Sequence, residues 1–141
     1  MAYTLTEIRT ALASTIETHT SASVYTYAEV QAKGNYPAVI IEPHATDFER
    51  AMNRGVDEWD FNIFVLVRSA DDASAQQELD GFVTGEGDDS IRQVLFEHRE
   101  LGLDDSVDAH VYSMRGYGGG FEWGGTKHMG AILKARVFVS N

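Results

Sequence analysis

The sequence has 141 residues, 43% of them hydrophobic, and it carries 22 acidic against 11 basic side chains, a formal net charge of −11. This length fits one domain, residues 1–141, and neither a repeat nor a change in composition marks a second. The lack of cysteine excludes disulfides and thiolate chemistry. The negative net charge opposes binding to nucleic acid or to an anionic membrane. No apolar run reaches the roughly 18 residues that a membrane span needs.

A helix and two short strands are expected in the first third of the chain. Residues 4–18 place four apolar side chains at helical spacing, and Thr4 followed by Glu7 has the form of a capping box. The four apolar residues are Leu5, Ile8, Leu12 and Ile16. Residues 24–27 and the β-branched run 38–41 predict short strands, the second of them buried.

The strongest strand signal is DEWDFNIFVLVR, residues 57–68. Large apolar side chains recur there at every second position, so one face of the strand belongs to the core. These residues are Trp59, Phe61, Ile63, Val65 and Val67. The other face begins polar and becomes apolar at Phe64 and Leu66, which predicts a central strand covered on both sides towards its end.

A projecting β-hairpin is predicted just before this strand. The buried run 38–41 is expected to close at Glu42-Pro43, and the turn residues Asn53-Arg54-Gly55 directly precede the long strand. Residues 46–60 are therefore interpreted as a hairpin whose tip projects beyond the domain, either as a contact device or as a surface loop.

Two short helices are expected after the long strand, because the apolar period changes from two to 3.6. The first ends near Phe82, with Asp71 or Asp72 as its cap, and the second is capped by Asp88 or Asp89. Ala75, Leu79 and Phe82 share a face of the first helix, and Ile91, Val94, Leu95 and His98 share a face of the second.

The last third predicts an antiparallel pair of strands. Residues 107–115 alternate in polarity, the glycine-rich loop GYGGGFEWGG follows at 116–125, and the closing strand alternates from Met129 to Val139. The predicted fold class is α+β: a single mostly antiparallel β-sheet with an N-terminal helix and two short helices packed on it, plus the projecting hairpin.

Residues capable of catalysis or ligand binding show no informative spacing. The five histidines form no HxH or HExxH pattern, and the acidic pairs 71–72 and 88–89 stand directly before predicted helices, where capping explains them. GEGDD lacks the ligand period of a calcium loop, and GYGGG lacks the lysine of a phosphate-binding loop. We therefore expect no catalytic residue, no metal site, no cofactor and no enzymatic activity.

Three aromatic residues in the glycine-rich loop allow two interpretations. Tyr117, Phe121 and Trp123 are large side chains in a segment whose glycines open many backbone conformations. Such side chains usually need a place to bury. They either fold back on their own sheet or contribute to an interface with another protein.

The middle of the chain resembles the tail terminator proteins of long-tailed bacteriophages, particularly those of actinobacterial phages. The matching pattern is a strand ending FVLVR, then SADDASAQQELDGFV, then GEGDDSIRQVL. The matching residues are Val67, Arg68, Asp71, Asp72, Ala75, Gln76, Leu79, Asp80, Gly87, Ser90, Ile91 and Leu95. The order of elements around this pattern also agrees, from the N-terminal helix to a closing strand after a glycine-containing loop.

The resemblance implies a structural virion protein that forms a ring, usually of six subunits, on the finished tail tube. Its partners would be the tail tube protein and the head–tail connector, with DNA passing through the lumen without specific binding and with acidic residues there repelling it. We expect assembly in the host cytoplasm, residence in the virion tail or neck, and no membrane association. Closed rings join two different patches; the predicted patches are the arm residues Phe48, Met52 and Arg54 and the glycine-rich loop.

Two alternatives remain open from the sequence. The chain could be another phage neck or tail-tube component, since such proteins also need two complementary patches. It could also be a small ligand-binding or enzymatic α+β domain with a site under the glycine-rich loop. The first predicts open polymers, and the second predicts a monomer or dimer with a concave pocket.

Overall fold

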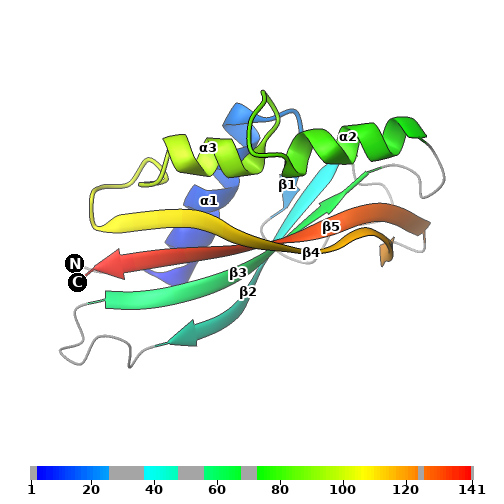
Figure 1. Ribbon diagram of the computed structural model, residues 1–141. Helices are drawn as coiled ribbons and strands as arrows, with labels where there is room; N and C mark the ends of the chain where they lie inside the picture. Colours follow the sequence, from blue (N-terminus) through cyan, green and yellow to red (C-terminus); the bar gives the residue numbers. More distant parts are fainter. Residues whose placement is uncertain (1–2, 26–36, 48–55, 68–72, 124–125, 141) are drawn as a thin grey trace.

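A computed structural model describes residues 3–25, 37–47, 56–67, 73–123 and 126–140. Its elements in chain order are α1 (Leu5–His19), β1 (Ser23–Tyr25), β2 (Ala38–Asp47), β3 (Val56–Leu66), α2 (Ala73–Val83), α3 (Ile91–Glu97), β4 (Val107–Trp123) and β5 (Thr126–Ser140). The five strands form one sheet in the order β1-β2-β3-β5-β4. All pairs are antiparallel except β1 with β2, so the α+β prediction is confirmed and β3 is the middle strand (Figure 1).

The three helices cover one face of the sheet (Figure 1). Each of them contributes to a single apolar cluster together with the inward side chains of β2, β3, β4 and β5. The largest fully buried members include Phe61, Phe82, Ile8, Leu12, Ile16, Ile63, Leu79, Ile91 and Leu95. The alternating residues of β3 therefore form the floor of the core, as the sequence predicts.

Helix α1 begins as its sequence indicates. The Thr4 side chain accepts a hydrogen bond from the Glu7 N–H (3.2 Å), and the Glu7 carboxylate accepts one from the Thr4 N–H (2.9 Å). This reciprocal pair is a capping box, which provides partners for two N–H groups that the first helical turn would otherwise leave unpaired.

The prediction that strand 38–41 ends at Pro43 is wrong. Strand β2 continues to Asp47, and its pairing with β3 shifts register between Pro43 and Ala45. Proline is tolerated there because β1 pairs only with residues 38–40, which leaves this part of β2 at the sheet edge. The pairs Thr46↔Trp59 and Asp47↔Glu58 confirm the hairpin; its tip lies outside the described residues.

Helix α3 begins at a different cap from the predicted Asp88 or Asp89. The N-cap is Ser90, whose hydroxyl accepts from the Gln93 N–H (3.1 Å) and donates to the Thr84 carbonyl. Asp89 instead accepts from the Ser21 N–H (2.8 Å) and so links this turn to the end of α1. The cap predicted for α2, at residues 71–72, lies outside the described residues.

The prediction of a glycine-rich loop at 116–125 is wrong, because β4 continues through residues 116–123. Pairing with β5 continues to Trp123↔Thr126, and the register shifts between Val111 and Ser113 and again between Arg115 and Gly119. Gly116 and Gly118 take φ values of +65° and +75° inside the second shift. These are bulges, and glycine occupies them because other residues are strained at positive φ.

The opposite face of the sheet is apolar at one end and polar at the other. Ile40 and Leu66 are fully buried there, with Tyr25 and Phe64 packed against them. Strand β3 is therefore covered on both faces towards its end, as the change from polar to apolar residues along it predicts.

Candidate interaction surface

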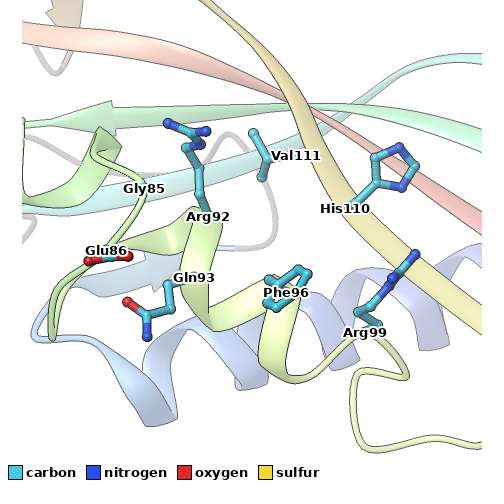
Figure 2. Close-up of a pocket in the computed structure, with 8 residues that line it drawn as sticks. All are labelled: Gly85, Glu86, Arg92, Gln93, Phe96, Arg99, His110 and Val111. Carbon is cyan, nitrogen blue, oxygen red and sulfur yellow. The ribbon is translucent and has the colours of Figure 1, made fainter.

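A groove of about 510 Å³ lies between helix α3 and the edge strand β4. It is lined by Gly85, Glu86, Arg92, Gln93, Phe96, Arg99, His110 and Val111. Figure 2 shows Arg92, Gln93 and Phe96 along α3, with His110 and Val111 on the neighbouring strand. One wall is therefore the outer side of a helix, and the other is the edge of a sheet.

Phe96 is the most exposed large apolar residue in the described part of the chain, with 70% of its surface accessible. Its neighbours Val94 and Leu95 point into the core. A helix turns by about 100° per residue, so the next position leaves the buried face. The phenyl ring stands at the surface of α3 between Gln93 and Arg99 (Figure 2), where it makes the groove apolar.

Arg99 connects the end of α3 to β4. Its guanidinium forms two hydrogen bonds with the Asp108 carboxylate, at 2.7 and 3.0 Å, and its carbonyl accepts the Ala109 N–H at 2.8 Å. The two side chains of this ion pair are nearly half exposed, so the pair adds little to stability. Its fork geometry nevertheless fixes the position of the groove's end.

The strand wall presents open backbone groups. Alternate residues of a strand turn their N–H and C=O groups to the same side. The Ala109 N–H points away from β5, towards Arg99, and Val111 two residues later has the same orientation. By this alternation the Val111 N–H faces the open side of the sheet, where an incoming chain could reach it.

Arg92 stands where this groove meets a smaller one. It lines both the α3–β4 groove and an adjoining cavity of about 250 Å³ with Val83, Tyr112 and Met114. Within the described part of the chain, its guanidinium forms neither an ion pair nor a hydrogen bond. A positive charge on this strongly acidic chain is thus left facing the groove.

Exposed apolar and aromatic side chains continue along β4. Tyr112, Met114 and Tyr117 have 43%, 44% and 38% of their surfaces accessible. The Tyr117 hydroxyl donates to the Asp80 carboxylate on α2, and this hydrogen bond raises the pKa of Tyr117 above its ordinary value. Phe96, Tyr112, Met114 and Tyr117 together give α3 and β4 an exposed apolar border.

The polar end of the helix-free face is internally paired. Arg136 of β5 contacts Asp60 at 2.9 Å and Glu58 at 3.4 Å, and its guanidinium carbon lies 4.4 Å from the centre of the Tyr112 ring. The hydrogen bond with Asp60 raises the pKa of Arg136. Lys134 donates to the Asn62 side chain at 2.6 Å. These pairs hold an arginine and a tyrosine, both common at protein interfaces, in one arrangement.

The sequence matches no known protein family and no curated protein. The surface residues themselves therefore indicate what the chain can do. Large apolar side chains, an arginine without a partner among the described residues and an open strand edge are features through which proteins bind other polypeptides.

The predicted contact residues fall in different parts of the structure. Phe48, Met52 and Arg54 lie outside the described residues. Phe121 and Trp123 are in β4 and pair with His128 and Thr126, but their side chains are also outside the described part. Tyr117 lies on β4 rather than in a loop, exposed and hydrogen-bonded to α2.

Sequence analysis missed Phe96, Arg92 and Tyr112 as surface residues. A signal existed for Phe96, because it falls off the face shared by Ile91, Val94, Leu95 and His98. Tyr112 likewise alternates with the buried residues of its strand. No comparable signal exists for Arg92, because only the tertiary structure places this residue of α3 beside β4.

Other polar groups in the described residues show packing roles. His19 and His98 stack at the ends of α1 and α3, with ring centroids 4.0 Å apart. The Asp104 carboxylate accepts from Tyr3 and Ser106, and these hydrogen bonds lower the pKa of Asp104. Among the described residues, no three His, Asp or Glu side chains are placed to hold a metal ion, and no helix has the length and apolarity to cross a membrane.

Proposed function

We propose that this chain is a tail terminator of a long-tailed bacteriophage. Its copies would form a closed ring at the end of the tail tube, stop tube growth and join the tube to the head connector. DNA would pass through the lumen of the ring. The resemblance of residues 64–95 to that family supports the proposal, as does the surface built by α3 and β4.

The residues that carry the resemblance frame this surface. Ala75 and Leu79 pack α2 into the core, and Ser90 caps α3. Gly87 has a φ of +125° in the connecting turn, where a side chain would be strained. The motif thus encodes the pair of helices and the turn between them, and α3 with this turn forms one wall of the groove.

The observation that carries the proposal is the combination of exposed Phe96, the uncompensated Arg92 and the open edge of β4 in one groove. A ring closed by rotation joins two different patches of the same chain. The α3–β4 surface supplies one patch with apolar, charged and backbone contacts. The segment between β2 and β3, which contains Phe48, Met52 and Arg54, stays our prediction for the other.

The first test is the mass and shape of the assembled protein. Light scattering after size exclusion, over a range of concentration and salt, should find a closed species near six copies of 15.6 kDa, about 94 kDa. Negative-stain microscopy of the concentrated protein should show single rings. Growing tubes would instead identify a tail-tube component.

The ligand-binding alternative predicts a monomer whose melting temperature rises with one compound from a metabolite or metal library. A ligand that binds only the folded state stabilises that state. For this test a second groove, about 570 Å³ along α1 and lined partly by Thr6, Thr10 and Ser14, is the place to map binding.

A further inference from the structure

We propose that the α3–β4 groove receives an extended, acidic segment of a neighbouring copy of this chain, which pairs with the open edge of β4. The inference rests on the proposed function, because it takes self-association into a ring as given. It adds the partner and the binding mode: strand addition at the sheet edge, with a carboxylate of the second copy at Arg92.

The backbone of β4 has the geometry that strand addition requires. The Arg99 carbonyl already accepts the outward Ala109 N–H, so one residue of the same chain starts a pairing that Val111 can continue. Helix α3 ends before Arg99, and the groove leaves the strand edge accessible from that point. An extended segment laid beside Val111 would form main-chain hydrogen bonds on the side of β4 that faces away from β5.

The charge of the groove favours another copy of this chain as the occupant. Arg92 and Arg115 form no ion pair among the described residues, and Arg115 is exposed on the same strand. Among the described residues that line the groove, Glu86 is the one carboxylate, and it lies on the turn before α3. With 22 acidic residues and a net charge of −11, a second copy offers the complementary charge.

The exposed phenyl ring gives the contact its apolar part. Phe96 has 70% of its surface accessible and stands on the helix wall, opposite the strand edge. Its burial beneath an incoming strand would remove a large apolar side chain from water and exclude water from the Arg92 charge pair. Aromatic residues and arginine placed this way are the groups that most often dominate binding.

The sharpest experiment exploits the absence of cysteine in the chain. Phe96→Cys, labelled with a benzophenone maleimide, would be mixed with uniformly ¹⁵N-labelled wild-type protein, irradiated and digested. The expected product joins the probe in one copy to an acidic peptide of another copy, identified by its ¹⁵N mass. Ser14→Cys, on the exposed side of α1, is the matched control and should give at least tenfold fewer such products.

Charge and polarity changes provide a second measurement. Phe96→Glu and Arg92→Glu should each raise the concentration of half-assembly at least tenfold, with circular dichroism and melting temperature unchanged. Ser14→Glu introduces a carboxylate on an exposed helix surface away from the groove and should change this concentration less than twofold. Assembly of Phe96→Glu at the wild-type concentration would overturn the inference.

The outcomes separate this inference from the proposed function. Rings that form while the probe at position 96 reacts only within its own chain would overturn the groove contact and leave the terminator proposal standing. Groove cross-links between copies that form open tubes would support the contact and contradict the terminator. A lack of any cross-link between copies at the highest soluble concentration would overturn the inference.

Discussion

Strands β3 and β4 have the same alternating pattern of apolar residues but different positions in the sheet. Strand β3 is hydrogen-bonded on both sides, by β2 and β5, and its residues Phe61, Ile63 and Val65 are fully buried. Strand β4 is bonded only to β5, is interrupted by two bulges and exposes Tyr112, Met114 and Tyr117. Alternation alone therefore does not distinguish a strand that holds the fold together from one that presents a surface.

The difference shows that one strand of this small domain mainly stabilises the fold and that the other mainly forms its surface. The central strand is covered by helices on one face and partly covered on the other, so its side chains contribute mainly to stability. The edge strand has a free side, and its bulges turn large side chains outward. Substitutions in β3 should therefore change folding, and substitutions along β4 and α3 should change association.

The largest expected effect is at the centre of the sheet. Phe61→Ala should lower the free energy of unfolding by about 3 to 5 kcal/mol, because it empties a fully buried aromatic site. Met114→Ala on β4 should cost less than about 1 kcal/mol, since 44% of that residue is already exposed. Urea melts of both variants provide the measurement. Equal losses would remove the distinction between the two strands.

The next effect concerns the start of α3, the helix that forms the groove with β4. Ser90→Ala should cost about 1 to 2 kcal/mol, because it removes the cap of the Gln93 N–H and the hydrogen bond to Thr84. Asp89→Ala should cost clearly less, about 0.5 kcal/mol, because it loses only one exposed hydrogen bond to Ser21. The opposite order in urea melts would make Asp89 the true cap.

A third prediction compares two ion pairs, one on β3 and one on β4. Asp60→Asn should cost about 1 kcal/mol, since Asp60 and Arg136 are mostly shielded from water at a 2.9 Å contact. Asp108→Asn should cost about 0.5 kcal/mol or less, because Asp108 and Arg99 are nearly half exposed. Denaturation in low and high salt measures both, and a larger loss for Asp108→Asn would contradict the comparison.

The smallest effect is the pH dependence of the contact between β4 and α2. The Asp80 hydrogen bond raises the pKa of Tyr117, so the protonated phenol is favoured in the folded state. This contribution is fully present below the ordinary tyrosine pKa, near 10, and is lost as pH rises through the higher folded value. The melting temperature of Tyr117→Phe should be slightly below wild type at pH 8 and should converge with it above pH 11 or so. A constant gap would exclude the titration.

Much of the architecture was predictable from local patterns. Apolar spacing located α1, the core of β3 and the two later helices, because a buried face repeats at the period of its own element. The capping box of α1 was also predictable, since Thr4 and Glu7 satisfy each other within one turn. The cap of α3 was not, because Asp88, Asp89 and Ser90 are all good caps and the choice depends on packing with Thr84 and Ser21.

The candidate surface was predictable only in part. Tyr117 was named from its aromatic character in a glycine-rich segment, but that segment is a strand whose glycines sit in a bulge. Local composition favours a loop there, whereas pairing with β5 supplies the hydrogen bonds that make it a strand. Phe96 and Arg92 acquire their roles from the approach of α3 to β4.

By itself, the sequence determined which faces are apolar, where α1 and the core of β3 lie, and that β3 is covered on both faces towards its end, because these depend on the periodicity of neighbouring residues along the chain. The tertiary structure alone decided which strand edge stays open, how far β2 and β4 extend and which exposed side chains meet in one groove. These depend on hydrogen bonds and contacts between residues distant in sequence. The periodicity of a single strand contains no information about its neighbours in the sheet.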